Sequence, residues 1–382
     1  MIYSLGMRIL QVGKYYPPCR GGMETVLRHM CEGLAERGHE VTALVAAASP
    51  RGSVAAIGGA RAGGRGRLVR AGTIWTLNGQ PLCPRFSALL RRELRASPPD
   101  IVQLHLPNPA ACAAVLANLR GDRARPRLTV WYHADITRQR LGRRAVAPLV
   151  ARCLDRAAGV AVSSEALRTR SPLLRSRLAR VRVIPFGIEP AEWSGGRHAH
   201  DGPFLFVGRL VRYKGLGTLL DAVARAPRAR LQIVGGGPLR RELAGRVSDP
   251  ALSERVSLLG ELDDVALRAA MGQARALVLP SDGEGETFGV VQLEAMAAGL
   301  PVISTRLPTG VAAVNADGVT GRVVPPADAG ALAGALVEIL DNPERSRAWG
   351  EAGRRRVRES FSRDRMLDDI ERWYADLLAQ PD

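Results

Sequence analysis

Several residue types are scarce in this sequence, and each shortage narrows the class of protein. The 382 residues include five cysteines without a C-x-x-C pair or metal-ligand spacing, so we expect a reduced, cytosolic chain with no metal site. No apolar run reaches 18 residues, which argues against a membrane-spanning helix. Aromatic residues make up only 4%, whereas hydrophobic residues make up 46% and charged residues 24%, a balance typical of soluble globular proteins.

Lysine is the rarest of the charged residues, although the net charge is +17. Lysine occurs only at Lys14 and Lys214, and arginine supplies the remaining positive charge. Because arginine is a planar fork and lysine a compact point charge, a site that needs the compact charge would keep its lysine. The positive field also favours polyanionic partners: nucleic acid, nucleotide phosphates or an anionic membrane surface.

Apolar runs of strand length alternate with helical patterns along the whole chain. This alternation predicts an α/β protein with parallel, doubly wound sheets. The pattern restarts after a Gly- and Pro-rich joint at 187–202, so we expect two Rossmann-like domains, 1–187 with the C-terminal helix 363–382, and 188–362. The strand candidates are 7–13, 39–46, 100–105, 127–133, 159–164, 181–187, 203–210, 230–237, 256–260, 274–281, 301–305 and 320–326.

Two segments stand outside this alternation. Segment 51–72 resembles an RGG-type RNA-binding tract but lacks interleaved aromatic residues, so we expect a mobile surface loop. Segment 366–378 is an amphipathic helix whose Trp373 and Tyr374 need a groove to pack into.

Three loops that follow predicted strands have residues suited to a phosphate or a base. Gly21 and Gly22 precede a helix, where backbone N–H groups can bind a phosphate, although a plain turn is equally consistent with the pair. Arg209 and Lys214 lie five residues apart on a glycine-flanked turn, which suits a diphosphate; the alternative is two solvated cations. Gly237 ends a triple glycine that lets a flat group approach the backbone, or simply forms a tight turn.

The stretch GETFGVVQLEAM places two carboxylates, Glu286 and Glu294, in an otherwise apolar segment. A helix beginning around Phe288, Gly289 and Val290 would offer free N–H groups to a phosphate. On one continuous helix both carboxylates would lean to the same side, about 12 Å apart, close to the length of a nucleoside diphosphate sugar. The alternatives are a helix-start carboxylate for Glu286 and an ion pair with an arginine for Glu294.

Taken together, these motifs closely resemble the retaining glycosyltransferases of family 4. The resemblance covers nearly the whole chain, in the expected order, and includes that family's E-x7-E signature. It implies the GT-B fold: two facing Rossmann-like domains with a central cleft, an N-terminal acceptor domain, a C-terminal nucleotide-sugar domain and a last helix that crosses back to the first domain. The motifs are PPCRGGMETV, VGRLVRYKG, VGGGPLRREL and GETFGVVQLEAMAAGLPVIST.

The resemblance implies roles for the matching residues of the C-terminal domain. Arg209 and Lys214 match the pair that binds the donor diphosphate and stabilises it as a leaving group. Glu294 matches the carboxylate that binds the ribose. Glu286 matches the one that contacts the transferred sugar, with the backbone of residues 288–290 beside it.

In the N-terminal domain the resemblance concerns fewer residues. Gly21 and Gly22 match a loop that faces the donor phosphate, and His133 matches a histidine that contacts the donor sugar. Without the resemblance, His133 is equally well explained as a structural residue at the end of a strand. Thr287 stands where many members have glycine, so the sequence alone does not explain the local backbone there.

The reaction that the resemblance implies requires no cofactor. Cleavage of the sugar–phosphate bond develops negative charge on the diphosphate, which Arg209, Lys214 and helix N–H groups would stabilise. In the family's usual account the departing phosphate takes the acceptor proton on the same face, so the anomeric configuration is retained. The sequence has no D-x-D motif, which predicts metal independence, although the acidic run Asp282, Glu284 and Glu286 could attract a cation.

The motifs resemble most the bacterial mannosyltransferases of exopolysaccharide and O-antigen assembly. This implies GDP-mannose as donor and a glycan or polyprenyl-diphosphate-linked acceptor. The basic stretch 138–156 suits the inner face of an anionic membrane, or is a solvated helix. The alternatives are a UDP-hexose donor with a soluble acceptor, a nucleotide-sugar 2-epimerase, and a nucleic-acid-binding protein. The last leaves the carboxylates and glycine turns unexplained, so we expect no nucleic-acid partner.

Overall fold

The computed structural model describes residues 6–19, 21–58, 63–77, 79–119, 126–135, 140–194 and 201–380, with the backbone alone for 77 and 140–145. The chain divides into two compact units. Unit 1 comprises Met1–Phe186 and Arg363–Asp382, and unit 2 comprises Gly187–Ser362. Each unit has a mainly parallel sheet with its own buried core, as the alternating pattern predicts.

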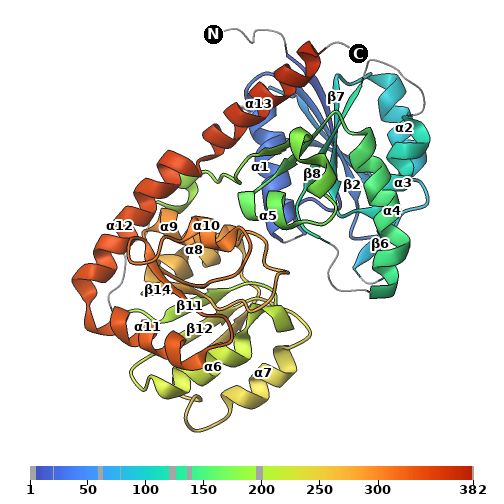
Figure 1. Ribbon diagram of the computed structural model, residues 1–382. Helices are drawn as coiled ribbons and strands as arrows, with labels where there is room; N and C mark the ends of the chain where they lie inside the picture. The colour runs from blue at the N-terminus through green and yellow to red at the C-terminus, as the bar shows by residue number, and fades with distance from the viewer. Residues whose placement is uncertain are drawn as a thin grey trace. The chain divides into compact units, whose positions relative to one another are not determined.

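The described part of unit 1 forms an eight-stranded sheet in the order β10-β9-β8-β7-β1-β2-β4-β3 (Figure 1). All neighbours pair in parallel except β3 and β4. The strands are β1 (Arg8–Val12), β2 (Glu40–Ala46), β3 (Ser53–Ile57), β4 (Gly66–Ala71), β7 (Ile101–Leu106), β8 (Arg127–Tyr132), β9 (Gly159–Val162) and β10 (Val181–Val183), and β5 (Trp75–Leu77) and β6 (Gln80–Leu82) form a separate hairpin.

Segment 51–72 is not the loop expected from its composition. It contains β3 and β4, and β4 lies between β2 and β3 within the sheet. Leu68 and Val69 are buried there, while Arg67 and Arg70 are partly exposed. Arg67 forms an ion pair with the buried Glu93, so an arginine in this strand stabilises the core instead of solvating a loop.

The helices of unit 1 cover the sheet, and the last of them comes from the C-terminus. They are α1 (Gly22–Glu36), α2 (Phe86–Ala96), α3 (Pro109–Asn118), α4 (Arg140–Arg156), α5 (Glu165–Arg170), the 3₁₀ helix η2 (Arg175–Arg180) and α13 (Arg363–Ala379). Asn108 caps α3 by accepting from the Ala111 N–H at 3.2 Å and donates to the Gly13 carbonyl at 3.1 Å. This cap fixes the start of α3 against the end of β1.

Helix α13 packs along α1, which confirms that the C-terminal helix returns to the first domain (Figure 1). Trp373 and Tyr374, which need a groove, are buried. A Cβ on Gly159 would lie 3.0 Å from the Trp373 ring, so glycine there makes room for the helix. At the C-terminal end of α1, Arg37 forms ion pairs with two residues of α13, Asp368 at 2.7 Å and Glu371 at 2.8 Å.

The described part of unit 2 forms a six-stranded parallel sheet in the order β13-β12-β11-β14-β15-β16. Its strands are β11 (Phe204–Val207), β12 (Leu231–Val234), β13 (Val256–Gly260), β14 (Ala276–Leu279), β15 (Val302–Thr305) and β16 (Gly321–Val324). Its helices are η3 (Pro190–Trp193), η4 (Arg212–Lys214), α6 (Leu216–Arg225), α7 (Arg240–Val247), α8 (Asp264–Gln273), α9 (Val290–Ala298), α10 (Val311–Val314), α11 (Ala329–Asp341) and α12 (Pro343–Ser360).

Parallel register brings the loops that carry the predicted site to one edge of this sheet. Val207 of β11 pairs with Val234 of β12, and β11 also pairs with β14. The loops after these three strands therefore leave the sheet side by side, at its carboxyl end, where open α/β folds bind ligands.

Candidate active site

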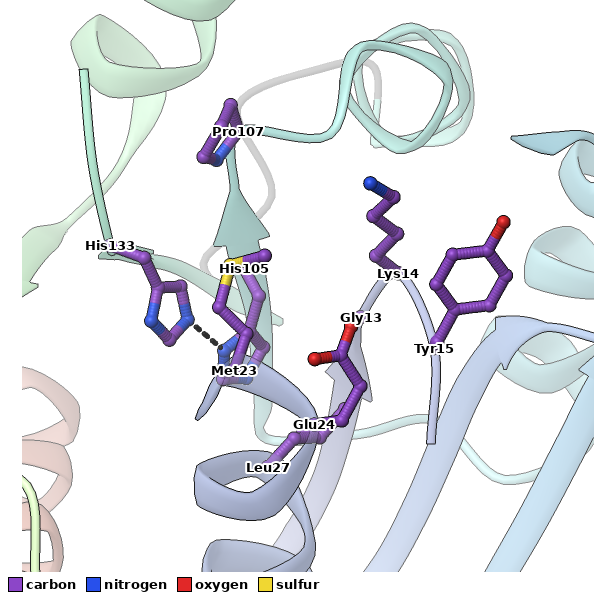
Figure 2. Close-up of a pocket in the computed structure, with 9 residues that line it drawn as sticks. All are labelled: Gly13, Lys14, Tyr15, Met23, Glu24, Leu27, His105, Pro107 and His133. Atoms are coloured by element: carbon purple, nitrogen blue, oxygen red, sulfur yellow. Dashed lines mark hydrogen bonds between the residues drawn. The ribbon is translucent and has the colours of Figure 1, made fainter. Parts of the chain in front are cut away.

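A pocket lies at the carboxyl end of the central strands of unit 1, beside the first turns of α1 (Figure 2). Its empty space is about 270 Å³, part of it open to solvent. The strands β1, β7 and β8 and the helix α1 each contribute to it. The lining residues are Gly13, Lys14, Tyr15, Met23, Glu24, Leu27, His105, Pro107 and His133.

His133, predicted to contact the donor sugar, is one of these residues. It follows β8, is 2% exposed, and its Nε2 lies 2.9 Å from Nδ1 of His105. The ring stacks near Trp131 and lies tilted against Phe186, with ring centroids 5.5 Å apart. Burial lowers the pKa of His133 to about 3, because a charged imidazole cannot be solvated there. At neutral pH His133 is therefore an uncharged hydrogen-bonding group.

Gly21 and Gly22 lie at the start of α1, where Gly21 is the N-cap. A Cβ on Gly21 would lie 2.2 Å from Oε2 of Glu24, so the carboxylate of the pocket residue Glu24 occupies the space of a side chain. A carboxylate at a helix start is stabilised by the helix dipole. Glycine at position 21 therefore has a structural reason as well as the predicted one.

In unit 2 the structure brings Lys214 and Glu286 together. The Lys214 ammonium forms an ion pair with Oε2 of Glu286, and Ser281 Oγ donates to the same oxygen at 3.1 Å. Lys214 is 9% exposed and Glu286 8%. Two charges so far removed from water persist because each compensates the other. Arg209 lies in the loop after β11 but is exposed and takes no part in this pair.

The turn that positions Lys214 requires a glycine at the next residue. Gly215 follows Lys214 at φ 65°, and a Cβ there would lie 2.0 Å from the Pro280 carbonyl oxygen. Since Pro280 directly precedes Ser281, this close backbone approach places the ammonium beside the Ser281–Glu286 loop.

The triple glycine has a packing reason that is independent of any ligand. A Cβ on Gly235 would lie 2.0 Å from the Gly208 carbonyl oxygen, and one on Gly237 would lie 2.6 Å from that of Leu210. Leu210 N donates to Gly236 O at 2.8 Å. The loops after β11 and β12 thus contact each other through their backbones, and this contact alone requires small residues.

The helix predicted to begin around residues 288–290 is confirmed as α9, but the explanation that one helix carries both Glu286 and Glu294 is wrong. Helix α9 begins at Val290, and Gly289 precedes it at φ 72° in the left-handed region. Glu286 therefore lies in the loop, while Glu294 lies partly buried in α9. The loop backbone is fixed by Thr287, whose carbonyl accepts from Gly310 N at 2.8 Å.

Phe288, the last of the residues predicted around this helix start, anchors the loop. Its side chain is 2% exposed and packs edge-on against Phe361, with ring centroids 6.1 Å apart. Gln292 Nε2 donates to the Phe288 carbonyl at 3.1 Å. Phe288 thus holds the loop through its ring and offers ligands only its backbone.

Several residues of these sites were not predicted from the sequence. Lys14, Glu24 and His105 line the pocket of unit 1, and Ser281 binds Glu286. Lys14 had a signal, since it is one of two lysines. His105 had a weaker one, a polar residue at the end of a buried strand.

The acidic run does not converge on one point. Asp282 and Glu284 are exposed, whereas Glu286 is buried against Lys214. Within the residues that the structure describes, no group of three or more His, Cys, Asp or Glu side chains could hold a metal ion.

Comparison with known proteins places both units in described families. Residues 20–192 match the family model described as Glycosyltransferase Family 4, and residues 192–356 match the one described as Glycosyl transferases group 1. O-antigen chain mannosyltransferase C of Escherichia coli is 34% identical, over 97% of this chain and 99% of its own. D-rhamnosyltransferase WbpZ of Pseudomonas aeruginosa is 30% identical, over 93% of this chain and 92% of its own.

Solved structures share the fold at lower identity. Sucrose-phosphate synthase from Thermosynechococcus elongatus superposes with a TM-score of 0.82 at 23% identity, covering 98% of this chain and 99% of that one. Anabaena HepE in complex with UDP-glucose gives 0.76 at 19% identity, covering 97% and 100%.

Proposed function

The chain belongs to glycosyltransferase family 4 and has the GT-B fold, and from this premise we propose that it transfers mannose from GDP-mannose, with retention of configuration, to a glycan or lipid-linked oligosaccharide in bacterial polysaccharide biosynthesis. The glycosyltransferase activity follows from the family. The donor, the stereochemistry and the acceptor are the proposed parts.

The buried Lys214–Glu286 pair is the observation that carries the proposed chemistry. The pair lies at the carboxyl edge of the unit 2 sheet, and Glu286 is four residues before Val290, the first residue of α9. A cation and the N–H groups of a helix start are the groups that stabilise a departing diphosphate. Arg209, exposed on the same loop, can add a second positive charge when the donor binds. We therefore assign the diphosphate to Lys214, Arg209 and the backbone of Gly289 and Val290.

The carboxylates then have separate roles. Glu286 is held by Lys214 and Ser281. In that position its carboxylate can accept hydrogen bonds from hydroxyl groups of the transferred sugar, and it is poorly placed to act as a nucleophile. Glu294 is assigned the ribose hydroxyls, for which a carboxylate is a good acceptor. In the proposed step the bond from the anomeric carbon to phosphate breaks, the bond to the acceptor oxygen forms on the same face, and the acceptor proton passes to the departing phosphate.

The names of the relatives support mannose. One is an O-antigen chain mannosyltransferase, and another is the phosphatidyl-myo-inositol mannosyltransferase of Mycolicibacterium smegmatis, 30% identical over 88% of this chain and 86% of its own. A UDP-hexose donor with a soluble acceptor is the second candidate, since the HepE structure contains UDP-glucose.

A donor screen separates the two candidates. Thermal unfolding is measured with GDP-mannose, UDP-glucose, UDP-GlcNAc and UDP-galactose, followed by turnover of each donor. A ligand at 100 times its Kd stabilises the folded state by about 2.7 kcal/mol, which is readily detected. We expect the largest shift and the fastest turnover with GDP-mannose; a UDP-sugar that exceeds it in both measurements rejects the mannose assignment. Turnover that persists in EDTA supports metal independence.

We also propose that unit 1 binds an anionic membrane surface. No helix in the described ranges is long and apolar enough to cross a membrane. Of the basic stretch 138–156, α4 covers Arg140–Arg156, and a second candidate contact lies on the β5–β6 hairpin. Trp75 and Leu82 pair across the β5–β6 hairpin and are 64% and 51% exposed.

Exposed arginines lie close to this hairpin in the sequence. Helix α2 follows it directly, and Arg85, Arg92 and Arg95 are exposed at a spacing that places them on one face. Exposed aromatic and aliphatic side chains beside arginines are typical of surfaces that bind anionic lipids.

Flotation with liposomes containing anionic lipid tests this contact. Replacing both Trp75 and Leu82 by serine should abolish flotation and leave hydrolysis of the soluble donor unchanged. Val265→Ser is the matched control, because Val265 is 71% exposed, more than either hairpin residue, but lies in unit 2. Equal flotation of the wild type and the double variant would reject the hairpin as the membrane contact.

A further inference from the structure

A chain of buried hydrogen bonds connects His133 to the C-terminal helix. His133 Nε2 lies 2.9 Å from His105 Nδ1, and His105 Nε2 lies 2.8 Å from Gln11 Oε1. Gln11 Nε2 donates to the Tyr374 hydroxyl at 3.3 Å, and that hydroxyl donates to Gln103 Oε1. All five side chains are at most 6% exposed. The chain crosses from the pocket through β7 and β1 to α13.

At the Gln103 end of this hydrogen-bond series, the donor and the acceptor can be assigned. Gln103 Nε2 lies 3.9 Å from Met30 Sδ, and a thioether sulfur can only accept. The amide nitrogen of Gln103 faces Met30, which leaves its oxygen to accept from Tyr374. The Tyr374 hydroxyl has a single proton, so its oxygen accepts from the Gln11 amide.

This direction is transmitted to the two histidines. With its nitrogen committed to Tyr374, Gln11 presents its oxygen to His105, so His105 Nε2 carries the proton. A neutral imidazole has one N–H, so His105 Nδ1 is an acceptor and His133 Nε2 must donate to it. Nδ1 of His133 is then left without a proton.

The state of His133 fits this assignment. Burial lowers the pKa values of both histidines, so both rings are neutral. Among the described residues no group bonds Nδ1 of His133, although it is buried. That nitrogen faces away from His105 (Figure 2). A buried acceptor with no partner among these residues is satisfied when a hydroxyl group of a ligand, or a water molecule, donates to it.

We propose that Tyr374 is a positioning residue: through Gln11 and His105 it holds His133 in the tautomer whose bare Nδ1 accepts from a hydroxyl group of the bound sugar. The identity of that ligand rests on the proposed function, whereas the tautomer does not. The C-terminal helix, distant in sequence, thereby determines how a pocket residue recognises its substrate.

Nitrogen-15 NMR of histidine-labelled, ligand-free protein tests the tautomer. The chain has only 6 histidines, and His133→Gln identifies the signal of interest. We expect the wild type to show His133 protonated at Nε2 alone. Tyr374→Phe removes the hydroxyl that orients Gln11, so both tautomers should appear. A mixture in the wild type, or an unchanged single tautomer in Tyr374→Phe, would overturn the proposal.

Two further variants keep the test decisive. Met30→Leu conserves core volume and removes only the sulfur that orients Gln103, so it should also yield both tautomers and serves if Tyr374→Phe fails to fold. Ile370→Val, on the same buried face of α13, should keep the wild-type tautomer.

Kinetics connect the tautomer to the reaction. Turnover is measured with GDP-mannose and with UDP-glucose. For the donor that the wild type uses, Tyr374→Phe should lower kcat/KM about tenfold, the scale of one lost hydrogen bond. A changed tautomer with unchanged kcat/KM would reject the positioning role. If the wild type turns over no donor, the proposed function fails, and the NMR result still decides whether α13 sets the tautomer.

Discussion

Replacing Lys214 by methionine removes one charge of a buried ion pair while keeping the apolar stem of the side chain. The Glu286 carboxylate then loses its counter-ion and keeps the hydrogen bond from Ser281. Breaking a buried pair in this way typically costs about 3–5 kcal/mol. Because both side chains are about one-tenth exposed, we expect the lower end of that range, about 3 kcal/mol, in the free energy of unfolding of unit 2.

The double variant Lys214→Met/Glu286→Gln separates stability from function. It leaves no buried charge unpaired, so it should recover most of the lost stability. Activity should not recover, because the cation that stabilises the departing diphosphate is still missing; the expected loss in kcat is about 10²–10³-fold.

Calorimetric unfolding and donor turnover are the two assays. Arg228→Met is the matched stability control, since the Arg228–Asp341 pair lies on the surface of unit 2, with side chains 65% and 48% exposed, and should contribute less than about 1 kcal/mol. If Lys214→Met costs no more than this control, or if the double variant is no more stable than the single one, the pair is not the buried interaction described above.

Three further predictions concern single positions. Glu294→Ala should weaken nucleotide binding by about 1.5–3 kcal/mol in isothermal titration, but not binding of a nucleotide without ribose hydroxyls; equal losses for both would contradict the ribose assignment. The pKa of His133 is about 3 in the folded protein and about 6.5 in the unfolded chain, so the unfolded chain takes up the proton first as the pH falls. The free energy of unfolding should therefore fall by up to about 1.4 kcal/mol per pH unit between about pH 6.5 and 3. His133→Gln should make that decline shallower in urea unfolding at several pH values, and an equally steep decline would refute the assignment. Gly215→Ala, with its Cβ on the Pro280 carbonyl, should destabilise by more than about 1 kcal/mol and reduce turnover, whereas Gly334→Ala in the exposed interior of α11 should be neutral or stabilising; similar thermal shifts would count against the turn.

Much of the fold follows from local sequence pattern. Strands such as Ala276–Leu279 are buried along their whole length, which requires the continuous apolar runs that identify them. Segment 51–72 shows where the pattern fails. Its glycines and arginines hide β4, because pairing with β2 and an ion pair with Glu93 make this strand favourable, and neither is visible in local composition.

The candidate site was only partly predictable, for a similar reason. Lys214 and Glu286 are conspicuous in the sequence, and the structure places them in contact although 72 residues separate them. The spacing of Glu286 and Glu294 misled, because the helix begins only at Val290, after Gly289 in a left-handed conformation, and leaves Glu286 in the preceding loop. A single backbone angle at a glycine overrides a periodicity argument.

By itself the sequence determined the alternation of strands and helices, the identity of the residues that carry charge at strand ends, and the family, because each of these is encoded over short stretches. Only the tertiary structure decided which polar groups are buried together. Gln11 and Tyr374 are 363 residues apart, and their hydrogen bond exists because α13 packs onto the first sheet. Proton positions on His133 follow from that packing, since in a dry interior every donor must find an acceptor, and only the folded chain specifies which one it finds.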